Sequence, residues 1–247
     1  MVNLKGYKGF CRVFGDHSYE ANHLLIHSLI NSYSVTSVMN RKIKCPDDFV
    51  PCGSVEWCLL SLGRKVTPDY YPDWLSPYLY RKIWKEDTWP LMRVFIKPSD
   101  RYKRFTGFVT SGTYRKKKKP PYWCSELVHF TNEWRYYISN GEVLCGEWYA
   151  GDEINTPDAP DLNITIPPDY CGAVDFGTLN TGEIALVEAN HPFACGMYGK
   201  RDDLYFQWLV DGWEYIKKKL LIQHFLLFHL RKKIKNSQKT FKDINIR

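Results

Sequence analysis

The sequence predicts an α+β protein in which a mainly antiparallel sheet region lies between a smaller leading domain and a helical C-terminal segment. Short β-rich runs separated by turn residues fill residues 91–203, which is typical of antiparallel strands. Residues 1–90 contain helical stretches and a region rich in Pro and Tyr, and residues 204–247 combine large apolar side chains with lysine and arginine clusters. We therefore expect three units with these boundaries.

The composition indicates an ordinary folded protein. The chain has 247 residues, of which 44% are hydrophobic and 25% charged, so neither a disordered tail nor a membrane bundle is expected. The longest apolar stretch, over residues 220–230, contains polar side chains and is too short to cross about 30 Å of hydrocarbon. Eight scattered cysteines without a Cys-x-x-Cys pair, and no signal-peptide pattern, predict reduced thiols and a cytoplasmic location.

The positive net charge of +7 comes from the end of the chain. Residues 217–247 contain 10 Lys and Arg against one Asp, whereas the other residues contain 24 Lys and Arg against 26 Asp and Glu. The body is therefore nearly neutral, and a basic tail attracts anionic partners weakly and with strong salt dependence. A protein that binds nucleic acid or an acidic partner stays open as an alternative function.

The expected elements follow the chain in this order. One helix is predicted over Glu20–Asn31 in the leading domain. One or two helices are predicted within Leu204–Lys235, where Trp208, Trp213, Tyr215 and Phe225 favour docking on the body as far as about Leu230. Seven strands are predicted between them, over Met92–Lys97, Phe105–Thr110, Trp123–Phe130, Trp134–Ser139, Val143–Tyr149, Gly172–Phe176 and Ile184–Asn190.

The hairpin over residues 172–190 is the most informative segment. A turn centred between Thr181 and Gly182 places Asp175 directly opposite Glu188. Strand alternation then predicts a core face with Val174, Phe176, Val187 and Ala189, and a polar face with Asp175, Glu188 and Asn190.

The polar face of this hairpin has the chemistry of a magnesium site. Opposed carboxylates lie about 5 Å apart and repel each other unless a cation lies between them. Two carboxylates and an amide oxygen suit Mg²⁺ bound together with substrate phosphates. A solvent-facing hairpin with polar outer residues explains the pattern equally well.

Two further segments supply cations. Alternation places Arg93 and Lys97 on one face of a strand that ends at Pro98, with Lys103 in the following turn, and three converging cations suit a triphosphate. Glu133 and Arg135 share a face of another strand. Solvated surface lysines and a surface ion pair are the alternatives for these two segments.

Taken together, these segments resemble the ATP-grasp fold, and most closely its phage and bacterial clade named for one arginine and two lysines. The resemblance covers about residues 51–199 and includes a leading-domain motif, Cys52-Gly-Ser-Val-Glu56. Its motifs in order are Phe95-Ile-Lys97-Pro, Lys103-Arg-Phe-Thr-Gly107, Ser125-Glu126-Leu-Val, Glu133-Trp-Arg135, Asp175 and Leu186-Val-Glu188-Ala-Asn190. The leading residues would then form an α/β pre-ATP-grasp domain.

The resemblance implies a role for each matching residue. Lys97 and Lys103 hold ATP phosphates, and Arg135 steadies the γ-phosphate or an acyl phosphate. The segment Glu126-Leu127-Val128 lies against adenine, Glu133 reaches the ribose, and Mg²⁺ is bound by Asp175, Glu188 and Asn190. The run Lys116–Lys119 falls where the family has a mobile phosphate lid, although a solvated charge run explains it as well.

The function implied is ATP-dependent ligation with Mg²⁺. ATP phosphorylates an unidentified carboxylate to an acyl phosphate, and an amine or similar nucleophile displaces the phosphate, in the cytoplasm of a bacterial or virus-infected host cell. An ATP-grasp kinase that stops at phosphorylation, and a nucleic-acid- or acidic-partner-binding protein on this scaffold, are the alternatives. The sequence has no Walker A loop and no Gly-x-Gly-x-x-Gly, so P-loop and Rossmann enzymes are not expected.

Overall fold

The computed structural model describes residues 2–63, 66–111, 118–199 and 201–222. It is an α+β structure, as the sequence predicts, and it has one parallel and two antiparallel sheets. Within these ranges no helix has both the length and the apolar character needed to cross a membrane. The basic tail beyond residue 222, including Phe225 and Ser237–Arg247, lies outside the described residues, as do Lys116 and Lys117 of the lysine run.

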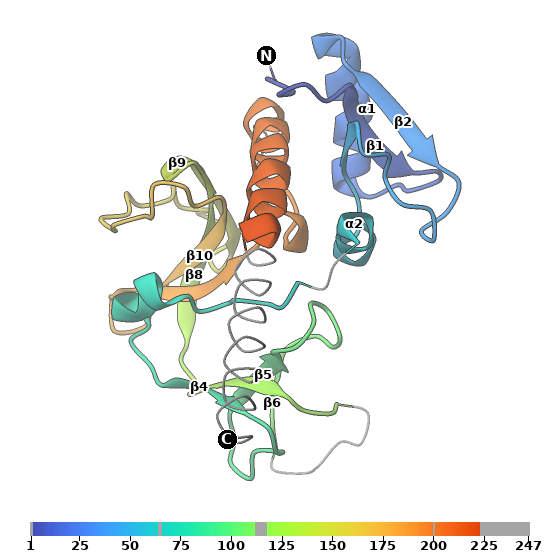
Figure 1. The fold of residues 1–247 in the computed structure, drawn as a ribbon. Helices are drawn as coiled ribbons and strands as arrows, with labels where there is room; N and C mark the ends of the chain where they lie inside the picture. The colour runs from blue at the N-terminus through green and yellow to red at the C-terminus, as the bar shows by residue number, and fades with distance from the viewer. Residues whose placement is uncertain (1, 64–65, 112–117, 200, 223–247) are drawn as a thin grey trace, which may run out of the picture.

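The leading residues form a small parallel sheet with two helices (Figure 1). Its strands and helices are β1 (Gly9–Val13), α1 (Tyr19–Asn31), β2 (Ser34–Val38), β3 (Phe49–Pro51) and α2 (Val55–Leu62). β1 is central and entirely buried, as expected for a parallel strand covered on both faces. α1 matches the predicted helix to within one residue, because the Ser18 hydroxyl accepts from the Ala21 amide and caps the first turn.

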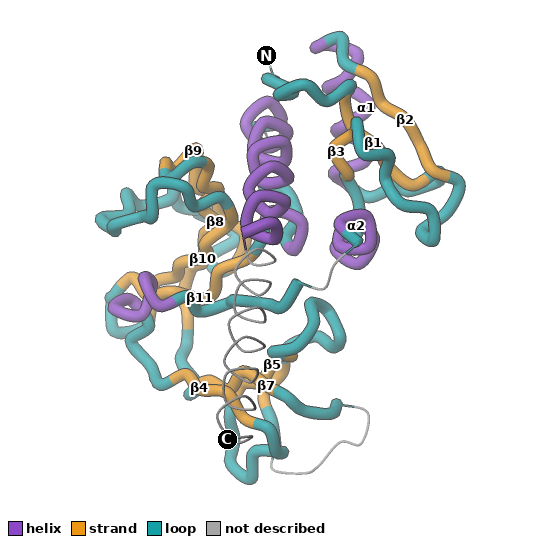
Figure 2. Tube along the Cα trace, viewed as in Figure 1, coloured by secondary structure: helices purple, strands orange, loops and turns teal. Residues whose placement is uncertain are grey.

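Two four-stranded antiparallel sheets follow, lying one below the other in Figure 2. In the first, the order is β4-β7-β5-β6, with β4 (Ile83–Glu86), β7 (Tyr122–Ser125), β5 (Phe95–Pro98) and β6 (Phe108–Val109). In the second, the order is β11-β10-β8-β9, with β11 (Ile184–Asn190), β10 (Gly172–Leu179), β8 (Phe130–Ser139) and β9 (Glu142–Ala150). Short 3₁₀ helices precede β4 and follow β11, namely η1 (Asp73–Tyr78) and η2 (Pro192–Ala194).

Two elements that precede residue 91 belong in space with these later sheets. β4 pairs with β7 through the register of Ile83 with Ser125, and η1 contributes Leu75 to the core beneath β8 and β10. The leading parallel sheet therefore ends well before the proline- and tyrosine-rich stretch, which connects it to the sheets that follow.

A helix over residues 202–222 lies between the leading domain and the β8–β10 sheet (Figure 1). Phe206 contacts Phe10 edge-on from one side, and Trp208 contacts Tyr137 from the other. The Trp208 indole also donates to the carbonyl oxygens of Ile138 at 3.0 Å and Gly172 at 3.1 Å. The largest core thus joins three parts of the chain, and burial of the aromatic side chains explains why this helix docks.

Candidate nucleotide-binding site

A cavity of about 360 Å³ lies between the two antiparallel sheets. It brings together six of the residues proposed from the sequence, namely Lys97, Glu126, Leu127, Val128, Glu133 and Glu188. Side chains that sequence reasoning missed complete its lining, among them Tyr71, Arg81, Phe95, Tyr149 and Val187. The cavity is therefore bounded by β5 and β7 on one side and by β8, β9 and β11 on the other.

The hairpin of β10 and β11 has the predicted opposition of carboxylates. Asp175 pairs with Glu188, and Ala173 pairs with Asn190, but the register shifts between Asp175 and Phe176. Phe176 consequently faces Leu186 rather than Val187. The shift is a β-bulge, which adds one residue to one strand and re-aims a side chain.

The bulge overturns the predicted position of Val187. Leu186 is fully buried in the core, whereas Val187 lines the cavity with Glu188. The rest of the predicted core face, formed by Val174, Phe176 and Ala189, is buried as expected.

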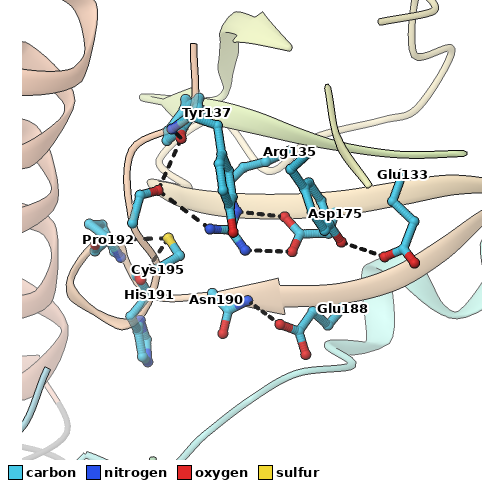
Figure 3. Close-up of polar contacts among 12 residues, drawn as sticks. Glu133, Arg135, Tyr137, Asp175, Glu188, Asn190, His191, Pro192 and Cys195 are labelled. Atoms are coloured by element: carbon cyan, nitrogen blue, oxygen red, sulfur yellow. Dashed lines mark hydrogen bonds and ion pairs between the residues drawn. The ribbon is translucent and has the colours of Figure 1, made fainter. Parts of the chain in front are cut away.

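Arg135 and Asp175 form a bidentate ion pair on adjacent strands. Their Nε–Oδ1 and Nη2–Oδ2 distances are 2.8 and 2.7 Å, and register pairing places the two residues directly opposite each other (Figure 3). Burial raises the pKa of Asp175 to about 6, although Arg135 opposes the shift. Burial alone disfavours the charge on Arg135, yet Asp175 holds the pKa of the guanidinium above its usual value.

Two stacked tyrosine rings lie against the Arg135 guanidinium. The rings of Tyr149 and Tyr198 stack at 14° with centroids 5.1 Å apart, and the guanidinium carbon lies 5.5 and 4.9 Å from those centroids. Nη1 of Arg135 donates to the Gly196 carbonyl oxygen at 3.4 Å, and the Tyr149 hydroxyl donates to Glu133 at 2.5 Å. Arg135 is thus fixed by the loop after β11 as well as by Asp175.

A second ion pair joins the two sheets. Lys97 on β5 donates from Nζ to Glu188 on β11, and Nδ2 of Asn190 donates to the other carboxylate oxygen at 2.8 Å. The Lys97 ammonium also lies 4.2 Å from the ring centroid of Tyr70. Burial opposes the charge on Glu188, but Lys97 and Asn190 hold its pKa below the usual value.

The donors on this face fit Mg²⁺ by chemistry. Asp175, Glu188 and Asn190 lie on one face of the hairpin and offer two carboxylates and one amide oxygen (Figure 3). Among the described residues no cluster of three or more His, Cys, Asp and Glu side chains is arranged to hold a metal. A cation here would therefore depend on oxygen ligands from substrate phosphates and water, as is usual for Mg²⁺.

Two predicted cations lie away from Lys97. β5 begins at Phe95, so Arg93 precedes the strand, is exposed and does not line the cavity. Lys103 has a positive φ of 50° in the turn after β5 and lines a second cavity, against the leading domain. The expected strand face shared by Arg93 and Lys97 is absent because the strand starts three residues later than predicted.

Arg81 is a structural residue of the site that the sequence did not indicate. Its guanidinium donates to Ser125 Oγ on β7 at 2.9 Å and to the carbonyl oxygens of Leu186 and Val187 on β11 at 2.5 and 3.0 Å. Next to it, Glu126 accepts from the Lys82 amide at 2.8 Å. Arg81 therefore ties the two sheets together along one edge of the cavity.

The cavity lies between two antiparallel sheets, with a lysine on one sheet and carboxylates on the other. This is the arrangement expected of the ATP-grasp class. The chain belongs to this family: residues 74–208, more than half of its length, match the model for the ATP-grasp domain of the clade named for one arginine and two lysines, family 2. The match runs from η1 into the helix over residues 202–222.

Solved structures also resemble parts of the chain. One of them is the ATP-grasp ligase PsnB complexed with minimal precursor, at 13% identity and a TM-score of 0.28, covering 49% of this chain and 47% of that one. The chain thus spans about half the length of that structure. None of the curated proteins matches the chain.

Proposed function

We propose that the chain is an ATP-dependent ligase that joins a carboxylate to an amine or similar nucleophile through an acyl phosphate. The observation that carries the proposal is the ion pair of Lys97 and Glu188 in the cavity lining, with the Arg135–Asp175 pair directly opposite Glu188. Membership of the ATP-grasp family supports ATP as the nucleotide.

The lining of the cavity suits a nucleotide. Leu127 and Val128 are 41% and 37% exposed, and together with Val187 they offer an apolar surface for a base. Glu133 also lines the cavity and would accept from the ribose hydroxyls. Lys97 would then contact the phosphates and exchange Glu188 for them, because a buried ammonium needs an anionic partner.

Glu188 in the cavity lining, with Arg135, Asp175 and Asn190 next to it on the same sheet, would support phosphoryl transfer. Asp175, Glu188 and Asn190 would hold Mg²⁺, which when bound neutralises charge on the phosphates. Arg135 would steady the transferring phosphoryl group, and the two tyrosine rings keep its guanidinium in one orientation. Lys103 would add positive charge from the neighbouring cavity, and Arg93 is the least supported of the proposed phosphate contacts because it is exposed.

The test is ADP release from Mg²⁺-ATP with a panel of carboxylic acids, in the presence and absence of hydroxylamine. A ligase of this kind gives carboxylate-dependent ADP release, and hydroxylamine traps the acyl phosphate as a hydroxamate. A product that keeps its phosphoryl group when amines are present would favour the kinase alternative. A chain that binds no Mg²⁺-ATP would contradict the proposal.

A further inference from the structure

The second cavity, of about 220 Å³, lies between the leading domain and the ATP-grasp domain. Its walls come from the start of α1, the N-terminal end of α2, the turn after β5 and the loop after β11. Charged and hydroxyl side chains of both signs line it, namely Asp16, Glu20, Arg41, Lys103 and Ser54. Apart from Lys103, the nucleotide site uses none of them.

This cavity adjoins the Arg135 centre through one loop. Gly196 lines the cavity, and its carbonyl oxygen accepts from Arg135 and from the Tyr137 hydroxyl, the latter at 3.0 Å. Glu20 also lines the cavity, and its Oε1 accepts from the Met197 amide at 3.1 Å. A Cβ at Gly196 would lie 2.6 Å from that oxygen, so a larger residue here would displace the Glu20 carboxylate. A molecule in the cavity therefore lies next to the group that would steady the acyl phosphate.

The charges in the cavity do not neutralise one another. In the part of the chain that the structure describes, Asp16, Glu20, Arg41 and Lys103 form no ion pair. Oδ1 of Asp16 accepts from the Ser18 amide at 3.0 Å, and the Ser54 hydroxyl makes no capping bond to α2. Separate acidic and basic groups in a small cavity are complementary to a small molecule that carries both charges.

We propose that this cavity binds the acceptor of the ligase reaction, and that the acceptor is a free amino acid. Its ammonium group lies against Asp16 and Glu20, and its carboxylate lies against Arg41 with the Ser54 hydroxyl. The inference rests on the proposed function and assigns the nucleophile that the function leaves open. Glu20 is the acidic group nearest to the Arg135 loop, so the ammonium end faces the transfer centre.

The amine, the acyl phosphate and Glu20 account for every proton and bond in the transfer. The ammonium loses one proton to Glu20, and the amine nitrogen forms a bond to the acyl carbon. The bond from that carbon to the phosphate oxygen breaks, and phosphate leaves with the electron pair. The second proton passes from the nitrogen to the departing phosphate, which leaves an amide.

The experiment measures binding of each standard amino acid to the full chain by saturation-transfer NMR and titration calorimetry. The tightest binder is then compared with its C-terminal amide and its N-acetyl derivative. We expect both derivatives to bind at least about tenfold more weakly, because each lacks one charged contact. Mg²⁺-ATP binding is measured in parallel.

Two variants assign the ends of the amino acid. Asp16→Asn keeps an oxygen for the Ser18 amide but removes the charge, so binding of the amino acid and of its amide should both fall about tenfold. Arg41→Gln should weaken binding of the amino acid by a similar factor and leave binding of its C-terminal amide unchanged. Exposed neighbours that do not line the cavity provide the controls, Asp47→Asn and Lys42→Gln, which should bind as the unchanged chain does.

The outcomes separate this inference from the proposed function. If the chain binds Mg²⁺-ATP but no amino acid, or if Asp16→Asn and Arg41→Gln bind the amino acid normally, the cavity assignment is wrong and the nucleotide site stands. Failure to bind Mg²⁺-ATP contradicts the proposed function, while the amino-acid measurements still decide the cavity. Circular dichroism of each variant confirms that it is folded.

Discussion

The two ion pairs of the site differ in how they are built. Arg135 and Asp175 lie on adjacent strands of one sheet, are both nearly inaccessible, and share two parallel hydrogen bonds. Lys97 and Glu188 come from different sheets, meet through a single contact, and leave the Glu188 side chain 23% exposed. The comparison indicates that the first pair holds Arg135 and Asp175 in a fixed orientation, whereas the second is a contact that a substrate can replace.

The largest expected effect is on stability, from Asp175→Ala. The change leaves the buried Arg135 charge without its partner, which costs about 3–5 kcal/mol in comparable pairs. Glu188→Ala should cost less, because Lys97 lines a cavity from which water or an anion can replace the lost carboxylate, and its ammonium keeps its contact with the Tyr70 ring. Urea denaturation of both variants measures the difference, and equal losses would remove the distinction between the pairs.

Glu188→Gln should abolish Mg²⁺-dependent ATP turnover while the chain stays folded. The change removes a charge from the cavity face and keeps the shape of the side chain, so activity should fall by at least about a hundredfold. Turnover is measured as ADP release, and circular dichroism checks the fold. Normal turnover in this variant would contradict the assignment of Glu188 to the metal.

Lys97→Ala should weaken ATP binding at least about tenfold and leave adenosine binding nearly unchanged, because the lost contact is with phosphate. Arg93→Ala is the matched comparison, since Arg93 is exposed outside the cavity and its removal should change ATP binding much less. Titration with both ligands gives the ratio. Equal loss of ATP and adenosine in Lys97→Ala would count against a phosphate contact.

The smallest expected effect is a difference in pH dependence between the pairs. The pKa of Asp175 is raised to about 6, so the folded state holds its proton more tightly than the unfolded chain does. Its contribution to the free energy of unfolding is therefore fullest below about pH 4 and declines as the pH rises through 6. The lowered pKa of Glu188 has the opposite sign, so its contribution is present near neutrality and is lost as the pH falls.

Denaturation of Asp175→Asn and Glu188→Gln beside the unchanged chain, between pH 4 and 7, measures these two contributions separately. The difference in free energy of unfolding between the unchanged chain and Asp175→Asn should grow as the pH falls. The corresponding difference for Glu188→Gln should shrink as the pH falls. If the free energy of unfolding of the two variants changed with pH in the same way, the two carboxyl groups would titrate alike and the distinction would be wrong.

The hairpin shows what counting along the sequence can and cannot predict. Counting from a turn at Thr181 and Gly182 placed Asp175 opposite Glu188, and this pairing is present beyond the bulge. Between the bulge and the turn the pairing differs from the count by one residue, as Phe176 with Leu186 shows. The carbonyl oxygens that flank this shift bond to Arg81, which lies more than a hundred residues earlier in the chain, and no periodic pattern carries such a long-range contact.

The predicted cations show the same limit. Arg93 and Lys97 are four residues apart, a spacing that would place both on one face of a strand. The strand begins only at Phe95, however, where pairing with β6 and β7 begins. Lys103 depends on a turn with positive φ, which carries it toward the leading domain. The tyrosines that lie against Arg135 come from β9 and from the loop after β11, so their convergence required the packed structure.

The bulge at Val187 also makes the chain one residue longer than its hairpin needs. Without Val187, Leu186 would still face Phe176 and Glu188 would still face Asp175, now in uninterrupted pairing. A single-codon deletion at this position would therefore preserve the opposed carboxylates while removing one cavity wall and one carbonyl that anchors Arg81. The extra residue is equivalent to an insertion that adds the Val187 side chain to the cavity lining, so we expect β11 to accept a one-residue deletion there more readily than at its neighbours.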